Sequence, residues 1–142
     1  MLVADTSVWV DFFNGRMTDE VVYLHIAVAQ DLAAVSDLIL YEVLQGFKTE
    51  SGFREARDLL LSLPFVPMGG RRLTVQAATN FRYLRARGIT IRASIDTLIA
   101  TAVIEGNHQL LHSDRDFDHF EQHLGLRVLH PQPQDVDQGD TQ

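Results

Sequence analysis

The chain has 142 residues, of which 46% are hydrophobic and 22% are charged. This is the size and composition of one globular domain with a core of its own. The absence of cysteine excludes a disulfide framework and a thiolate zinc site, and the net charge of −7 argues against a general nucleic-acid coat protein. The first residues lack a signal-peptide pattern and no apolar run approaches the ~20 residues of a membrane helix, so we expect a cytoplasmic protein without membrane contact.

Short apolar runs alternate along the chain with longer segments of helical periodicity. The apolar runs predict five β-strands, at residues 2–4, 32–35, 64–67, 109–112 and 126–129. The intervening segments predict seven helices, at residues 6–13, 20–30, 37–47, 53–63, 73–87, 95–105 and 117–123. This alternation indicates an α/β fold of three layers, in which helices flank a five-stranded parallel sheet.

Local signals refine this outline. Ser36 and Ser94 are predicted N-caps of the helices that follow them. The prolines at both ends of the strand at residues 64–67 favour a position near the sheet edge. Residues 131–142 contain almost no apolar side chains, so we expect a domain at residues 1–130 and a disordered polar tail.

Four acidic residues occupy positions where a carboxylate needs an explanation. Asp5 and Asp114 each follow a predicted strand, and ligands bind beyond the carboxyl ends of parallel strands. Glu42 and Asp96 lie inside apolar helical segments. Clustered carboxylates repel one another unless a hard cation neutralises them, and Mg²⁺ or Mn²⁺ suits oxygen ligands. The sequence therefore predicts a divalent-metal phosphodiesterase site formed by these four residues.

Two of these acids also have structural explanations at helix starts. Thr6 or Ser7 is a predicted helix cap, which is compatible with a metal-binding Asp5. Asp96 stands in a first helical turn, where a carboxylate together with Ser94 complements the helix dipole. Capping explains Asp96 as well as metal binding does when that residue is considered alone.

The interpretation of the other two acids, Glu42 and Asp114, is also open. Glu42 has apolar neighbours, yet helical glutamates commonly face solvent. Asp114, Asp116 and Asp118 can each cap a helix that begins near Phe117. Asp114 directly follows the strand and is our first candidate for a metal ligand, Asp116 is the second, and we expect Asp118 to be solvated.

The basic residues are concentrated in one segment. Residues 71–92 contain six arginines and no acidic residue, and these are half of all lysines and arginines in the chain. The segment is either a phosphate-binding surface or a solvated helix face, and the sequence alone leaves both interpretations open.

Four sequence blocks together resemble the PIN domain, specifically the VapC-type toxins of bacterial toxin–antitoxin pairs. The blocks are DTSVWVDFF, LYEVLQGF, IRASIDTLIA and LLHSDRDFD, which occur in the family's order and spacing across roughly residues 1–130. The resemblance implies a Mg²⁺- or Mn²⁺-dependent endoribonuclease that cleaves structured RNA such as tRNA or rRNA. It also implies a five-stranded sheet, a homodimer and inhibition by a small cognate antitoxin protein.

The resemblance assigns the metal ligands to Asp5, Glu42, Asp96 and Asp114. It also places Arg92, just ahead of the Asp96 helix, near the substrate. In such a site the metal activates a water and holds the phosphate, and Asp114 or Glu42 orients or deprotonates that water, so no side-chain nucleophile is needed.

The resemblance also bears on partners and on rival functions. An antitoxin helix would lie along the domain and send a basic side chain into the carboxylates. Trp9 and Phe12 are candidates for the groove that binds this helix; core or dimer contacts explain these two residues equally well.

The rival function is a catalytically weak PIN scaffold that acts as a binding or regulatory module. A phospho-acceptor receiver domain is disfavoured because the single lysine, Lys48, lies in the middle of the chain.

Overall fold

The computed structural model describes residues 1–132, so all but the first two residues of the predicted polar tail lie outside the described part. Three strands are present there: β1 (Leu2–Ala4), β2 (Ala33–Ala34) and β3 (Gln109–Leu111). The helices are α1 (Thr6–Phe13), α2 (Asp19–Ala29), α3 (Asp37–Leu44), α4 (Glu50–Leu61), α5 (Arg71–Ala86), α6 (Ser94–Glu105) and α7 (Asp116–Leu124). The predicted helices are therefore all present, with ends that differ by a few residues.

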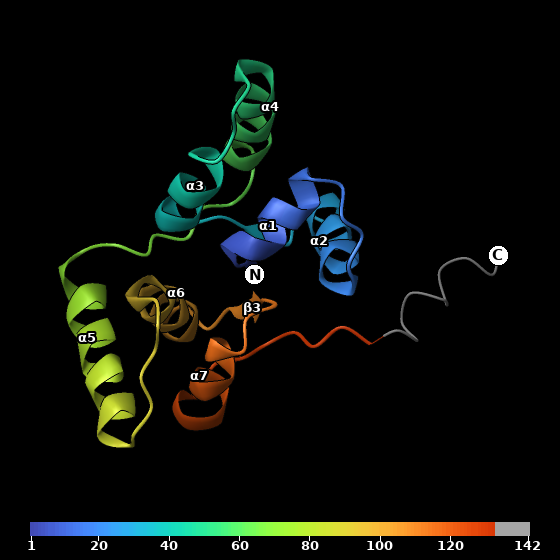
Figure 1. Cartoon of the computed structure of the whole chain (residues 1–142). Coiled ribbons are helices and arrows are strands. Elements are labelled where there is room, and N and C mark those ends of the chain that lie inside the picture. Colours follow the sequence, from blue (N-terminus) through green and yellow to red (C-terminus); the bar gives the residue numbers. More distant parts are fainter. Residues whose placement is uncertain (133–142) are drawn as a thin grey trace.

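The strands form a parallel sheet in the order β2-β1-β3. Figure 1 shows helices around β3, the one strand labelled there. In the central strand, Val3 pairs with Ala34 on one side and with Leu110 on the other. All three residues are fully buried, as expected for strands covered on both faces. Because the strands are parallel, the segments that follow β1 and β3 leave the sheet at the same edge.

The prediction of five strands is wrong. The segments at residues 64–67 and 126–129 each form only a single bridge, Val35 with Phe65 and Leu110 with Val128. Prolines at positions 64 and 67 lack the N–H that a longer ladder needs. The later segment is bounded by the left-handed turn at Gly125 and by Pro131. Both segments extend the sheet by one residue pair and end there.

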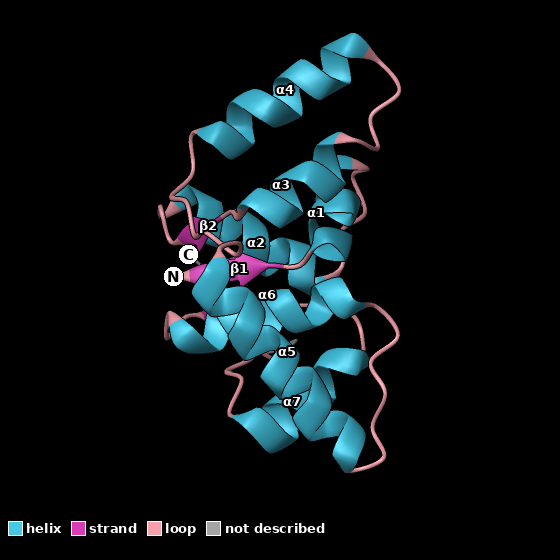
Figure 2. Cartoon of the chain, turned by 90° about the vertical axis from the view of Figure 1, so that its left-hand side faces the viewer, coloured by secondary structure: helices cyan, strands magenta, loops and turns pink. Residues whose placement is uncertain are grey.

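Helices cover both sides of this small sheet. Helices α5, α6 and α7 lie below the strands in Figure 2, and α3 and α4 lie above them. The core between these layers is apolar and includes fully buried large side chains: Trp9, Leu24, Ile39, Leu60, Phe117 and Phe120. Among residues 1–132, no helix is both long enough and apolar enough to cross a membrane.

The helix starts decide which polar side chains remain available for the site. Ser36 caps α3 as predicted, accepting a hydrogen bond from the Ile39 N–H at 3.2 Å. The prediction for Ser94 is wrong: Ala93 occupies the N-cap position and Ser94 is the first helical residue. Helix α1 likewise begins after Asp5 rather than after a capping Thr6 or Ser7. The polar side chains at the start of α1 are therefore not used for capping.

Candidate metal centre

Asp5 lies at the carboxyl end of the central strand. Its backbone N–H donates to the Leu111 carbonyl at 2.9 Å, and its carboxylate accepts a hydrogen bond from the Ser7 hydroxyl at 3.0 Å. The residue is only 6% exposed. Burial raises the pKa of Asp5, and the charge of Glu42 adds to the rise, while hydrogen bonds from Thr6 and Ser7 partly oppose it. Asp5 is thus a buried acid held in place by its own strand-to-helix turn.

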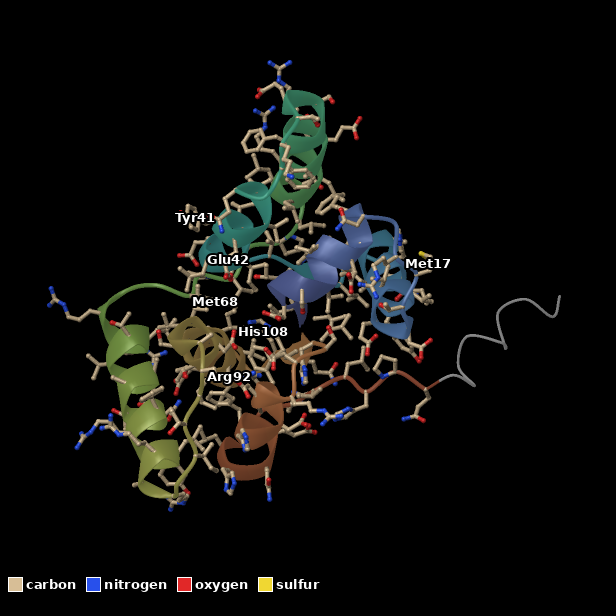
Figure 3. The ribbon with its side chains drawn as sticks, in the orientation of Figure 1. Met17, Tyr41, Glu42, Met68, Arg92 and His108 are labelled. Carbon is tan, nitrogen blue, oxygen red and sulfur yellow. The ribbon has the colours of Figure 1, made fainter. Side chains whose placement is uncertain are left out.

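Glu42 reaches the same place from helix α3. Its Oε1 accepts a hydrogen bond from the Thr6 hydroxyl at 2.8 Å, so the half-buried carboxylate turns toward the start of α1 (Figure 3). The solvent-facing interpretation of Glu42 is therefore wrong. Within residues 1–132 its second carboxylate oxygen makes no hydrogen bond to another residue, so this oxygen remains available to a ligand.

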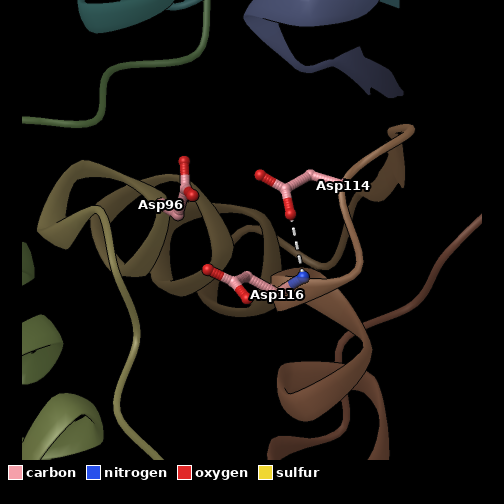
Figure 4. Close-up of side chains that lie close together, drawn as sticks. All are labelled: Asp96, Asp114 and Asp116. Atoms are coloured by element: carbon pink, nitrogen blue, oxygen red, sulfur yellow. Dashed lines mark hydrogen bonds between the residues drawn. The ribbon is translucent and has the colours of Figure 1, made fainter.

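Three further acids, all aspartates, converge on one another. Asp96 in the first turn of α6, Asp114 after β3 and Asp116 at the start of α7 each place a carboxylate oxygen within 4.8 Å of the other two (Figure 4). The backbone N–H of Asp116 donates to Asp114 Oδ1 at 2.9 Å, and the N–H of Asp114 donates to His112 Nδ1 at 3.1 Å. The turn between β3 and α7 thereby fixes two of the three carboxylates relative to each other.

The five acids act on one another electrostatically. The pKa of Asp96 rises from its ordinary value of 3.8 to about 7. Burial is the largest cause, followed by the negative charges of Asp5, Asp114, Glu42 and Asp116. A partly buried cluster of like charges of this kind favours a bound cation. The donors are carboxylate oxygens alone, which fits a hard ion such as Mg²⁺ or Mn²⁺.

The structure therefore brings two of the four predicted ligands, Asp96 and Asp114, directly together. Asp5 and Glu42 lie outside the 4.8 Å group but close enough to affect the pKa of Asp96. Asp116, our second candidate in its stretch, belongs to the group. The sequence does indicate a role for Asp116, because Asp114 and Asp116 are separated by one residue in the turn that follows a strand.

The positively charged side chain of Arg92 contacts two of these acids. Its Nε lies 3.3 Å from Asp116 Oδ2 and its Nη2 lies 4.0 Å from Asp114 Oδ1. The side chain is 80% exposed and points from the loop ahead of α6 toward the acids (Figure 3). Sequence reasoning placed Arg92 near a substrate and missed these ion pairs, because the partners are more than 20 residues away along the chain.

The arginines of α5 and Arg87, which directly follows this helix, differ in their contacts; the Arg85 guanidinium lies over the Phe81 ring, 5.8 Å from its centre. Arg72 forms an ion pair with Glu105 at 3.0 Å, and the Arg87 guanidinium stacks 3.4 Å from the centre of the Tyr83 ring. Arg82 and Arg85 form no ion pair with any described residue. They line an open cavity of about 490 Å³ between α5 and α6, whose lining also includes Phe81, Ser94 and Thr97. Ser94 and Thr97 flank Asp96 in sequence, so this cavity adjoins the helix that carries the acid.

Trp9 and Phe12 differ in their surroundings. Trp9 is fully buried, so the core interpretation is the right one for this residue. Phe12 is half-buried and stacks against His25 with ring centres 4.3 Å apart. A shallow cavity of about 120 Å³ lies between α1 and α3, and it is lined by Val10, Phe13, Asn14, Val43, Gly46 and Phe47.

Comparison with known proteins matches this arrangement to one family. Residues 2–122 match the sequence model of the family described as "PIN domain". Ribonuclease VapC11 of Mycobacterium tuberculosis and VapC ribonuclease Mb1587 of Mycobacterium bovis are each 28% identical to this chain over 120 residues. The aligned region covers 83% of this chain and 90% of each relative.

Solved structures share the fold at low sequence identity. VapBC2 from Rickettsia felis, bound to a DNA fragment from its promoter, has a TM-score of 0.69 at 20% identity. DNA-bound VapBC from Salmonella typhimurium has a TM-score of 0.70 at 14% identity. In both cases the match covers 90% of this chain and 96% of the other.

Proposed function

Because this chain belongs to the PIN domain family, we propose that it is a Mg²⁺- or Mn²⁺-dependent endoribonuclease and the toxin of a toxin–antitoxin pair. The observation that carries the proposal is the convergence of Asp96, Asp114 and Asp116 within 4.8 Å at the carboxyl edge of a parallel sheet. The relatives named as ribonucleases support the reaction class. We place the nuclease domain at residues 1–130.

We assign the metal ligands to Asp5, Glu42, Asp96 and Asp114, and we add Asp116 to this set. When bound, the ion would supply Lewis acidity to the scissile phosphate and favour deprotonation of the attacking water. The five carboxylates come from five places in the chain: the ends of β1 and β3, and the helices α3, α6 and α7. Their convergence supports a shared cationic ligand, because without one the clustered negative charges only repel one another.

The remaining chemistry belongs to the chain's own groups. The unpaired oxygen of Glu42 is suited to accept the proton of the attacking water, since Thr6 fixes the other oxygen. Ser7 holds the Asp5 carboxylate in one orientation. The Ser7 hydroxyl also lies 3.4 Å from the Ser113 hydroxyl, which joins the turn after β1 to the turn after β3. These contacts pre-organise the acids before any substrate arrives.

The substrate that we propose is structured RNA, such as tRNA or rRNA. The guanidinium groups of Arg82 and Arg85, which form no ion pair with a described residue, line the cavity beside the Asp96 helix, where they would neutralise phosphates that flank the scissile bond. The apolar wall of that cavity, which includes Phe81, offers a surface for base stacking. An acidic protein with one local basic surface can bind RNA there and repel it elsewhere.

The partners that we propose are a cognate antitoxin and a second copy of the chain. Two of the solved structures similar to this chain are VapBC assemblies, which supports the first partner. The antitoxin would place an apolar helix over the cavity between α1 and α3 and direct a basic side chain toward the carboxylates. A homodimer is proposed from the family resemblance alone.

Expression in a bacterial host tests the toxin function. The wild-type chain should arrest growth and produce discrete cuts in cellular RNA, and co-expression with its cognate antitoxin should restore growth. An Asp96→Asn variant at equal protein level should leave growth and RNA intact. Harmless expression of wild-type protein with uncut RNA would contradict the toxin function and favour the binding-module alternative.

A further inference from the structure

Arg92 contacts two carboxylates of the proposed metal site from outside it. Besides the Nε contact of 3.3 Å to Asp116, the Arg92 backbone N–H donates to the same Oδ2 atom at 3.5 Å. The side chains of Asp116 and Asp114 are 15% and 39% exposed, whereas that of Arg92 is 80% exposed. The acids are thus fixed by the fold, and the guanidinium can leave them for solvent without disturbing the core.

The guanidinium and a metal ion would compete for the same two carboxylates, those of Asp114 and Asp116. Asp114 Oδ1 lies 4.0 Å from Arg92 Nη2 and already accepts the Asp116 N–H. A divalent ion on these carboxylates would also repel the nearby positive charge, because both cations would lie a few ångströms apart. Among residues 1–132, Arg92 is the lysine or arginine that forms ion pairs with the acids of this site; Arg72, by contrast, pairs with Glu105 elsewhere.

We infer that Arg92 is an internal cation that competes with the metal for Asp114 and Asp116. It stabilises the metal-free cluster and thereby lowers the affinity of the site for a divalent ion. This inference rests on the proposed function, since it presumes that the carboxylates bind a metal. It assigns Arg92 a role in setting the metal concentration at which the site fills, in addition to any contact with RNA.

Metal binding without RNA tests the inference. Calorimetric titration of the full chain with Mn²⁺ alone should show that Arg92→Gln binds the ion about three- to tenfold more tightly than wild type, as expected for loss of one exposed competing charge. Arg72→Gln is the matched control, because Arg72 is 76% exposed and has a single acidic partner away from the site. This control should bind Mn²⁺ with wild-type affinity.

Two further measurements separate charge from shape. Arg92→Lys keeps the charge without the planar fork, so its Mn²⁺ affinity should stay within about twofold of wild type. In EDTA, Arg92→Gln should have a lower thermal midpoint than wild type, and saturating Mn²⁺ should raise the midpoint of the variant more than that of wild type. Both measurements are independent of RNA cleavage.

Equal or weaker Mn²⁺ affinity in Arg92→Gln would overturn the inference. A weaker affinity would mean that Arg92 orients the carboxylates for the metal instead of competing with it. Such a result would leave the proposed function intact. The absence of Mn²⁺ binding by the wild-type chain would instead contradict the proposed metal site itself.

Discussion

Thr6 donates a hydrogen bond to Glu42 Oε1 at 2.8 Å, although the two residues are 36 positions apart. This bond links the first residue of α1 to the middle of α3, and it turns the Glu42 carboxylate toward Asp5. A residue that a sequence pattern suggests as a helix cap thus serves to orient a site carboxylate. The geometry of the site therefore depends on a hydroxyl that is itself no metal ligand.

Thr6→Val should impair catalysis without unfolding the protein. The substitution keeps the side-chain shape and removes the donor, so Glu42 loses its fixed orientation. We expect kcat/KM for RNA cleavage in Mn²⁺ to fall about ten- to hundredfold, the effect of losing one hydrogen bond to a charged group. Thr6→Ser restores the donor and should recover most of the activity. Full activity in Thr6→Val would show that Glu42 needs no such support.

Asp96→Asn should change how stability depends on pH in the metal-free protein. The pKa of Asp96 rises from 3.8 to about 7 in the folded state, so the folded state binds the proton more tightly than the unfolded state does. The resulting contribution to stability is fully present below about pH 4 and is lost as the pH rises through 7. The asparagine variant avoids this loss.

The measurement for this prediction is urea unfolding in EDTA between pH 5 and pH 8. The difference in free energy of unfolding between Asp96→Asn and wild type should grow by about 1–3 kcal/mol in favour of the variant over this range. Asp19→Asn is the control, because Asp19 is exposed and lies in α2, which carries none of the site's acids. A constant difference across the range would mean that Asp96 carries no elevated pKa.

Arg82→Ala combined with Arg85→Ala should weaken RNA binding. Loss of two phosphate contacts should reduce the slope of log affinity against log salt by about 1–2, since each contact to a single strand contributes roughly 0.7. Binding is measured in EDTA by fluorescence anisotropy, so that cleavage does not interfere. The control is the double variant Arg71→Ala with Arg72→Ala, which removes the same charge at the other end of α5. It should reduce the salt dependence of RNA binding less. Equal effects of the two double variants on RNA binding would favour the alternative that residues 71–92 form a solvated helix face.

Sequence reasoning succeeded where the signal was local. Ser36 stands directly before an apolar helical repeat, and it caps that helix. The strand preceding Asp5 is a short apolar run, and the sheet contains it in the expected parallel arrangement. These features follow from residues within a few positions of one another, where patterns in one chain are informative.

The errors concern relationships between distant segments. The runs at residues 64–67 and 126–129 look like strands, but their flanking prolines and the turn at Gly125 limit each to one bridge. Asp116 was also predicted to be a weaker ligand candidate than Asp114, because the sequence does not reveal that the carboxylates of both residues lie close to that of Asp96. The contact between Arg92 and these acids depends on how the loop ahead of α6 meets α7, and no local pattern encodes that meeting.

Cleavage of RNA by wild-type protein and by Asp5→Asn, each purified and supplied with Mn²⁺, tests the central claim most directly. We expect wild type to cut tRNA or rRNA, EDTA to stop the reaction, and Asp5→Asn to lose at least about a hundredfold in rate. The thermal midpoint of Asp5→Asn in EDTA should equal or exceed that of wild type, because one buried like charge is removed. Undiminished cleavage by Asp5→Asn, or cleavage that persists in EDTA, would contradict a metal-dependent nuclease built on these carboxylates.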